Sequence, residues 1–506
     1  MIHLTGSSLT VEQLIAIADA FETVDLPEEA AGRVSASRAV VDRHASGTEA
    51  VYGVNTGFGA LAETAIARDG LEALQLNLLR SHAAGVGEPL SVRAVRASMA
   101  LRANVLAKGF SGIRLTTLER FIALLNRRVH PIVPSRGSVG ASGDLAPLAH
   151  LALVLIGEGE ATVGDNPRRR PGREALALAE LEPVTLAAKE GLALINGTQP
   201  SAAVLALALG GAERLARAAD IAAALSIDGL RGSIRPFDPR VHDARPYEGQ
   251  RTSARNILRL LEGSGINASH ADCGRVQDAY SLRCAAQVHG AARDALRFVR
   301  EAVSIEMNAA TDNPMVFAGD GDIVSGGNFH GAPLAVAADL LAIALAQIVT
   351  ISERRSDRLV NPVLSDLPAF LTRHGGLQSG YMMAQVTAAA LTSEIKTLAH
   401  PASVDTIPTS ANREDHVSMS MGAALKAARA LELATRVVAI ELIFACQAID
   451  LLAPLATSPL LQRVHARVRA EVAPLTDDRP PAPDIERIAA MIESGALESV
   501  CTGDVK

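Results

Sequence analysis

The chain has no tryptophan, and aromatic residues make up only 3% of its 506 positions. Aromatic and β-branched residues favour strands, whereas alanine and leucine, which dominate here, favour helices. Cysteine is also scarce, and its four residues stand apart with no Cys-x-x-Cys pair, at Cys273, Cys284, Cys446 and Cys501. Such spacing supports neither a disulfide framework nor a structural zinc site. The composition therefore predicts a mainly helical protein that holds no metal.

The first residues, Met1-Ile2-His3-Leu4, contain no basic stretch followed by an apolar core, which a secretory signal requires. We expect a cytoplasmic protein, because the scattered cysteines suit a reducing compartment. The net charge of -7 and the pI of about 6.0 argue against nucleic-acid binding by bulk electrostatics.

Four stretches rich in alanine and leucine are several times longer than a typical strand, and they predict long helices at residues 201–225, 332–355, 384–398 and 421–452. Residues 332–351 are the best candidate for a membrane span, but Asp339 and Gln347 interrupt them. A charge at mid-span costs roughly 2.5–3.5 kcal/mol. Because helices that are apolar nearly all round need neighbours on every side, we expect no membrane span. The predicted fold is mainly α, a long multi-helix bundle with a mixed, loop-rich N-terminal region.

Changes in sequence character divide the chain into residues 1–200, a long-helix bundle at 201–475, and a helical tail at 476–506 that begins in a proline-rich break. Thr10 and Thr116 each open a capping-box pattern, which predicts a helix start. Residues 165–172 combine turn residues with a short basic run, and we expect them to form a solvated surface loop.

The run at residues 137–144 contains Ala141-Ser142-Gly143, three of the smallest residues in a row. The backbone nitrogen of Gly143 can attack the carbonyl carbon of Ala141, since neither side chain blocks a tight ring and glycine accepts unusual backbone angles. Loss of two waters, one of them from the Ser142 side chain, gives a five-membered imidazolone with an exocyclic methylene. That group is a strong electrophile, which no ordinary side chain supplies.

Simpler interpretations of this run compete with the electrophile. Glycine and serine clusters usually form plain loops. The serine-hydrolase elbow Gly-x-Ser-x-Gly does not match, because Asp144 stands at the second glycine, and no Gly-Lys-Ser/Thr follows to make a phosphate loop. Five further polar segments in apolar surroundings favour a reactive site, since polar groups are costly to bury unpaired. They lie at residues 81–82, 196–199, 277–284, 325–330 and 410–416.

Together these segments resemble the aromatic amino acid ammonia-lyases. The matching residues run in one order along most of the chain, at 52–59, 137–159, 189–199, 280–283, the segment around Asn328, and 398–418. The resemblance implies a mainly helical homotetramer with shared active sites and an amino acid substrate. It also implies that Ala141, Ser142 and Gly143 form 4-methylidene-imidazol-5-one (MIO) autocatalytically, with no external cofactor.

The resemblance assigns the catalytic roles. Elimination of ammonia from an α-amino acid needs an electron sink, which MIO supplies, and a base, which is Tyr52. Free tyrosine has a pKa near ~10, so we expect nearby helix N-termini to make Tyr52 more acidic. Tyr280 is implied to assist in positioning the substrate or the electrophile.

The resemblance also implies which side chains hold the substrate. Arg283 offers a planar fork for the α-carboxylate. Asn196 and Gln277 hold the electrophile and the polar end of the substrate, and Phe329 packs near the electrophile.

Two positions point to the side chain of the substrate. Ser81-His82 matches the pair typical of the histidine-specific branch, and the Glu414 carboxylate suits an imidazole ring. They predict elimination of ammonia from L-histidine to give trans-urocanate. Two departures from the family pattern affect this prediction. Arg413 stands where glutamine is usual, and pairing of Arg413 with Glu414 would change the affinity for imidazole. Ala285-Ala286 replaces residues that are bulkier in the family.

Other functions stay open at this point. A tyrosine ammonia-lyase or a MIO-dependent aminomutase keeps the chemistry, since His82 can also face a phenolic hydroxyl. A helical scaffold without catalysis is a second alternative. A metal-dependent hydrolase is the weakest, because the histidines are scattered and no His-Glu-x-x-His occurs.

Overall fold

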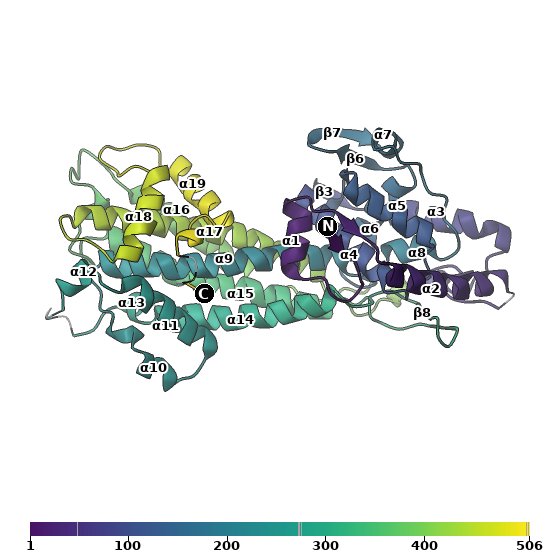
Figure 1. The fold of residues 1–506 in the computed structure, drawn as a ribbon, viewed down its shortest axis with the longest axis horizontal. Helices are drawn as coiled ribbons and strands as arrows, with labels where there is room; N and C mark the ends of the chain where they lie inside the picture. The colour runs from purple at the N-terminus through teal and green to yellow at the C-terminus, as the bar shows by residue number, and fades with distance from the viewer. Residues whose placement is uncertain (48, 272–273, 275, 502, 504) are drawn as a thin grey trace. The chain divides into compact units, whose positions relative to one another are not determined.

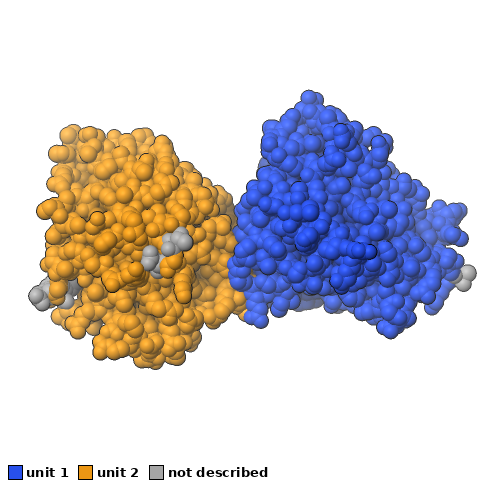
Figure 2. Space-filling model, in the orientation of Figure 1, with its two compact units in different colours: residues 1–207, 300–339, 401–425 blue, residues 208–299, 340–400, 426–506 orange. Residues whose placement is uncertain are grey.

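The structure of the protein is a computed structural model, which describes residues 1–506 apart from 48, 272–273, 275, 502 and 504. Cys273 therefore lies outside the described residues. The chain divides into two compact units, which Figure 2 colours separately: unit 1 is Met1–Leu207, Arg300–Asp339 and Pro401–Leu425, and unit 2 is Ala208–Val299, Leu340–His400 and Lys426–Lys506. This division differs from the predicted boundaries after residues 200 and 475, because the chain re-enters unit 1 at Arg300 and at Pro401.

Among its described residues, unit 1 combines helices with four small sheets. Some of these helices and strands are labelled in Figure 1. Its helices are α1 (Val11–Asp19), α2 (Glu28–Ser46), α3 (Leu71–His82), α4 (Val92–Ala107), α5 (Leu115–Asn126), α6 (Leu145–Leu155), α7 (Gly172–Leu178) and α8 (Glu190–Ile195). Its strands are β1 (Ile2–His3), β2 (Val24–Asp25), β3 (Val86–Pro89), β4 (Val129–Pro131), β5 (Pro134–Arg136), β6 (Glu160–Val163), β7 (Asn166–Pro171), β8 (Met315–Phe317) and β9 (Asp322–Val324). The pairs β1–β2, β3–β5 and β8–β9 form separate ladders, and β6 lies between β4 and β7. The mixed, loop-rich N-terminal region is confirmed.

Unit 2 is built from helices. Those wholly within it are α10 (Pro239–Asp243), α11 (Glu248–Leu261), α12 (Gly265–Ala268), α13 (Tyr280–Arg283), α16 (Met382–Leu398), α18 (Pro459–Glu471) and α19 (Ala482–Glu493). Four longer helices contribute residues to both units: α9 (Gln199–Gly229), α14 (Ala285–Glu306), α15 (Ala332–Val360) and α17 (Ser420–Leu451). The mainly α prediction is confirmed, and the four predicted long helices are α9, α15, α16 and α17, each within a few residues of its expected ends.

The buried carboxylate of Glu441 joins three of the long helices by hydrogen bonds within unit 2. Glu441 on α17 accepts hydrogen bonds from Ser226 on α9 and from Ser352 and Arg355 on α15. All four side chains are buried. A carboxylate is stable in the interior only when it is paired and hydrogen-bonded, so this cluster fixes how the three helices pack.

Helix α15 contains the apolar stretch that was the best candidate for a membrane span in the sequence. Among the described residues it is the one helix long and apolar enough to cross a bilayer, and 72% of its most apolar window is buried inside the protein. Burial against neighbouring helices is what the bundle prediction requires of such a sequence.

One of the two predicted capping boxes is present. The Thr10 hydroxyl accepts from the Gln13 backbone N–H at 3.2 Å, and the Gln13 side chain accepts in return from the Thr10 N–H, which starts α1. The box at Thr116 is wrong, because α5 starts at Leu115. There the backbone N–H of Arg114 is satisfied at 3.0 Å by the carboxylate of Glu190, which the fold brings in from α8.

The predicted loop at residues 165–172 is also wrong in part. Asn166–Pro171 forms strand β7, which pairs antiparallel with β6. Because β7 is the outer strand of its sheet, it tolerates proline and a run of arginines that a central strand would not. Its basic residues are mostly exposed, as a surface segment requires.

Candidate active site

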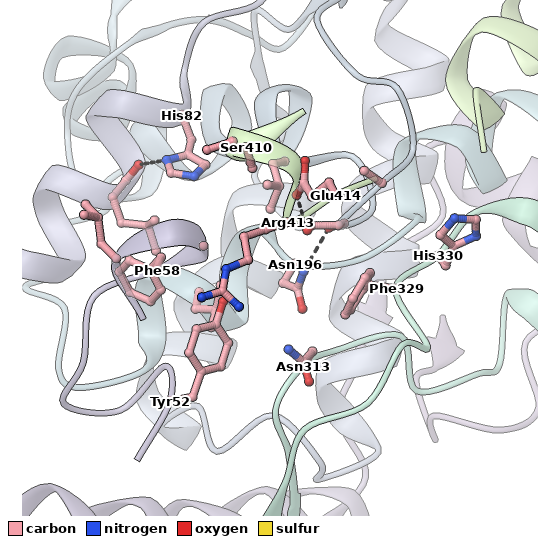
Figure 3. Close-up of a pocket in the computed structure, with 18 of the residues that line it drawn as sticks. Tyr52, Phe58, His82, Asn196, Asn313, Phe329, His330, Ser410, Arg413 and Glu414 are labelled. Carbon is pink, nitrogen blue, oxygen red and sulfur yellow. Dashed lines mark hydrogen bonds between the residues drawn. The ribbon is translucent and has the colours of Figure 1, made fainter. Parts of the chain in front are cut away.

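A cavity of about 670 Å³ lies within unit 1, and the Ala141-Ser142 end of the tripeptide forms part of its wall. Figure 3 shows labelled side chains around it that come from widely separated segments. Six of the eleven residues predicted for the site line this cavity besides Ser142: Tyr52, His82, Ala141, Asn196, Phe329 and Glu414. The fold therefore gathers most of the predicted site in one place.

The backbone before Ala141 is fixed by the segment that leads into α17. The Met419 N–H donates to the Val139 carbonyl at 2.7 Å, and the Ser418 hydroxyl donates to the Gly140 carbonyl at 2.8 Å. Gly140 has φ +66°, and a Cβ there would lie 2.3 Å from the Ser418 hydroxyl oxygen. Only glycine fits such a close approach.

The backbone after Ser142 is fixed by the turn that leads into α9. Gly143 has φ +72°, and a Cβ there would lie 2.3 Å from the Gly197 carbonyl oxygen. That same carbonyl accepts from the Asp144 N–H at 2.8 Å. The buried Asp144 carboxylate accepts from the hydroxyls of Ser138 (2.5 Å) and Ser201 (2.6 Å), while burial raises its pKa. The tripeptide is thus held at both ends.

Asn196 holds the middle of the tripeptide, since its side-chain N–H donates to the Ser142 carbonyl at 2.8 Å. Asn196 follows α8, and the buried guanidinium of Arg102 caps that helix end by donating to the carbonyls of Ala193 (3.1 Å) and Asn196 (2.8 Å). Burial lowers the pKa of Arg102 to about 10, which keeps it charged at neutral pH. Asn196 Oδ1 is buried with no hydrogen-bond partner among the described residues, so it is an acceptor available to a ligand.

These contacts fit cyclisation of Ala141-Ser142-Gly143. Glycine is required at 143, where the place of a side chain is filled by the Gly197 backbone. Rigid anchors on both sides remove conformations that a ring closure would otherwise have to exclude, which lowers its entropic cost. The cavity leaves the Ser142 side chain accessible to a substrate, because Ser142 lines the wall.

His82 offers the cavity a hydrogen-bond acceptor. Its Nδ1 donates to the Leu78 carbonyl at 2.9 Å, which leaves Nε2 as the acceptor of the neutral ring. Burial lowers the pKa of His82, while the Leu78 carbonyl and the Glu414 charge raise it less. The ring is therefore neutral at neutral pH.

Tyr52 lines the same cavity, and its ring packs edge-to-face against the ring of Phe58, with the two ring centroids 6.4 Å apart. The expectation of a more acidic Tyr52 is wrong for this arrangement. Burial raises the pKa of Tyr52, the backbone N–H of Gly59 lowers it, and the negative charge of Glu414 raises it again. Both upward effects disfavour the phenolate, and they exceed the one hydrogen bond that favours it.

Glu414 is held by two hydroxyl groups. Its Oε1 accepts from the Ser142 hydroxyl and its Oε2 from the Thr409 hydroxyl, each at 2.5 Å. Pairing of Arg413 with Glu414, which the sequence left possible, is absent, since no ion pair joins the two within the described part of the chain. Arg413 instead lines the cavity as an exposed side chain (Figure 3).

Three predicted site residues lie elsewhere. Gln277, Tyr280 and Arg283 line a separate cavity of about 530 Å³ in unit 2. The Arg283 guanidinium stacks on the Tyr280 ring at 4.6 Å, so the two residues share one side of α13 as predicted. The Tyr280 side chain is 71% exposed.

Two contributors to the site are not among the residues that the sequence predicted. Asn313 lines the cavity, and its side-chain oxygen accepts from the Gly326 N–H at 2.8 Å. The polar run Thr311-Asp312-Asn313 before a proline was the available signal, because such runs mark turns at the ends of elements. Thr409 left no comparable signal, since its role depends on a contact with Glu414.

The chain is similar to known proteins in both sequence and structure. A sequence model of the family described as aromatic amino acid lyase matches residues 9–470. A histidine ammonia-lyase of Anaeromyxobacter dehalogenans is 56% identical over 98% of this chain and 99% of its own length. The crystal structure of histidine ammonia-lyase from Trypanosoma cruzi is 46% identical, has a TM-score of 0.93 and covers 100% of this chain and 96% of that one.

A tyrosine aminomutase structure from Streptomyces globisporus is similar as well, with a TM-score of 0.94, 38% identity, and coverage of 100% of this chain and 99% of that one. The family model spans most of the chain, and the histidine ammonia-lyase relative matches it nearly end to end. The chain belongs to the aromatic amino acid lyase family.

Proposed function

We propose that this protein is a MIO-dependent histidine ammonia-lyase that converts L-histidine to trans-urocanate and ammonia. The observation that carries the proposal is the cavity that brings Ser142 together with Tyr52, His82 and Glu414. The curated relative named histidine ammonia-lyase, at 56% identity over nearly the whole chain, supports the same substrate. We also propose that the protein is located in the cytoplasm.

The residues of the cavity have distinct tasks in this proposal. The MIO group formed from Ala141, Ser142 and Gly143 supplies an electrophile for the substrate. Tyr52 removes the proton from the β-carbon, for which it must reach the phenolate form. Asn196 accepts a hydrogen bond from the substrate amine through its unpaired Oδ1.

Two acceptors face the side chain of the substrate. A neutral imidazole has one N–H to donate and an imidazolium has two, and the free Nε2 of His82 and the carboxylate of Glu414 accept from them. A phenyl ring has no donor, so it would leave both acceptors unpaired, at roughly 1–3 kcal/mol each. The pocket therefore favours histidine over phenylalanine.

A tyrosine-specific lyase or aminomutase is the second candidate, because a phenolic O–H can donate to the same acceptors. The tyrosine aminomutase structure, with its TM-score of 0.94, supports that alternative on fold, although its identity of 38% is below the 46% of the histidine ammonia-lyase structure.

The substrate is tested with purified protein given L-histidine, L-tyrosine and L-phenylalanine in parallel. We expect the ultraviolet absorbance of urocanate to grow with histidine and no coumarate absorbance to grow with the other two. Coumarate or β-tyrosine from tyrosine at a higher rate than urocanate would assign the second candidate instead.

A His82→Phe variant tests, in the same assay, how much His82 contributes to the preference for histidine. Removing the acceptor leaves a substrate N–H unpaired, which costs roughly 1–3 kcal/mol and lowers kcat/KM for histidine about 10- to 100-fold. Phenylalanine loses no hydrogen bond in the variant, so its rate relative to histidine rises.

We also propose that the protein is a homotetramer with shared active sites, in which Tyr280, Arg283 and Gln277 reach the unit 1 cavity from a neighbouring subunit. Two observations support this. These residues do not line the cavity of their own chain as the structure describes it, and Tyr280 is largely exposed. Arg283 then supplies the fork for the α-carboxylate of the substrate.

Sharing is tested by co-expressing two inactive variants with different tags, Ser142→Ala and Arg283→Ala. If each site combines two chains, random mixing rebuilds about one site in four with both residues intact. We expect about a quarter of wild-type activity in tetramers purified through both tags. Doubly tagged tetramers that stay inactive would contradict shared sites.

A further inference from the structure

Glu414 and Ser142 are in direct contact in the unmodified chain. The Ser142 hydroxyl donates to Glu414 Oε1 at 2.5 Å, which is a short, charge-assisted geometry. Ser142 Oγ is the atom that leaves when the tripeptide matures, so the carboxyl group of Glu414 touches the leaving atom itself. No other side chain bonds to Ser142 Oγ among the described residues.

The loop that carries Glu414 aims its carboxyl group at Ser142. Residues Ser410–Asn412 form a left-handed turn, with φ of 50°, 53° and 65° in three consecutive residues other than glycine. Such a turn costs roughly 1–2 kcal/mol per residue. It is closed by backbone hydrogen bonds in both directions between Thr409 and Glu414, at 3.0 and 3.4 Å, and by the bond from the Thr409 hydroxyl to Oε2. The strain is retained where it fixes one functional carboxyl group.

We propose that Glu414 is the acid that expels the Ser142 hydroxyl during formation of MIO, a role that rests on the proposed function and is separate from its contact with the substrate. Ring closure comes first: a bond forms between the Gly143 nitrogen and the Ala141 carbonyl carbon, and the carbonyl oxygen leaves as water with the amide protons of Ser142 and Gly143. Glu414, whose two oxygens both accept hydrogen bonds in the structure, first takes up a proton from solvent, and the Cβ–Oγ bond of Ser142 then breaks as Glu414 transfers that proton to Oγ. The Cα proton passes to solvent and a Cα–Cβ double bond forms, so that one further water is lost and Glu414 is again a carboxylate.

Asp144, the acidic residue that follows the tripeptide, binds groups other than the Ser142 hydroxyl. The Asp144 carboxylate is fully buried and accepts from Ser138 and Ser201, so it holds the backbone rather than the leaving atom. Once Ser142 Oγ has left, Glu414 Oε1 loses its partner while Oε2 is still held by Thr409. The same oxygen that assists maturation is then available to the substrate ring.

The test is the mass of the tryptic peptide at residues 137–168 from purified protein. Wild type is expected to lack two waters. Glu414→Gln keeps the size of the side chain but has no proton to transfer, so its peptide is expected to lack only the water of ring closure. His82→Ala, at the same cavity but with no contact to Ser142, is the control and is expected to lack both.

Chemical rescue separates a missing acid from a damaged fold. A thiol, with a pKa near 8.5, leaves far more readily than a hydroxyl and needs no acid. The double variant Ser142→Cys with Glu414→Gln is therefore expected to lose water and hydrogen sulfide completely. Glu414→Asp, which keeps the acid on a shorter chain, is expected to mature more slowly than wild type.

Each outcome bears on one proposal. Loss of both waters by Glu414→Gln at the wild-type rate, or no rescue in the double variant, overturns the role of Glu414 in maturation and leaves the proposed function intact. A wild-type peptide of unmodified mass overturns the proposed function itself.

Discussion

Replacing Ser142 with alanine is expected to abolish turnover of histidine, with kcat lower by a factor on the order of 10⁴ or more. The reason is chemical rather than structural. Alanine has no hydroxyl to eliminate, so no methylene can form and no electrophile meets the substrate amine. The hydrogen bond to the Glu414 carboxylate that is lost with the hydroxyl contributes about 1.5–3 kcal/mol, which a protein of this size tolerates.

The measurement is urocanate formation by Ser142→Ala beside wild type, with far-ultraviolet circular dichroism to show that the fold persists. Ser7→Ala is a suitable control, since Ser7 is an exposed serine of the same unit that does not line the cavity. It is expected to keep full activity. Near-normal turnover in Ser142→Ala would remove the electrophile from the mechanism.

Tyr52→Phe is expected to lower kcat by about 10²- to 10⁴-fold, the usual contribution of a positioned acid or base. The phenyl ring keeps the packing against Phe58, and the tripeptide is untouched, so MIO forms as in wild type. A peptide that lacks two waters in a nearly inactive enzyme is therefore the expected signature of this variant. Unchanged turnover in a fully matured Tyr52→Phe enzyme would assign the base elsewhere.

The pH dependence gives a second test of Tyr52. Burial raises the pKa of Tyr52, so at neutral pH only a small fraction is phenolate, and that fraction grows about tenfold per pH unit below the pKa. Wild-type kcat/KM is therefore expected to rise as the pH increases above neutrality. The substrate amine titrates in both enzymes, so the part of the rise that Tyr52→Phe loses belongs to Tyr52. Identical profiles in the two enzymes would contradict its role as base.

The features that the sequence predicts well depend on local composition. Long alanine- and leucine-rich stretches have no alternative to helix, and α9, α15, α16 and α17 appear where they were expected. The capping box at Thr10 is equally local. The start of α5 could not be predicted, because the carboxylate of Glu190 caps the Arg114 N–H from another part of the chain. Strand β7 exists only because β6 pairs with it.

In the site, too, local sequence predicts some features, whereas others depend on contacts between distant segments. Residue types with a specific chemistry, such as Tyr52 and Ser142, were identified from their segments, and the fold places them on one cavity. Electrostatics required the three-dimensional structure: the raised pKa of Tyr52 reflects burial and the charge of Glu414, neither of which is visible in the segment at 52–59. The left-handed turn at Ser410–Asn412, which aims Glu414 at Ser142, contains no glycine, so its left-handed backbone could not be predicted from the sequence.

The proposed mechanism depends on conversion of Ala141-Ser142-Gly143 into the electrophile of a lyase. The most direct test is the mass of the tryptic peptide at residues 137–168 from the wild-type protein. This peptide is expected to be lighter than its sequence by two waters, whereas a peptide with the full mass of its 137–168 sequence would show that no electrophile forms.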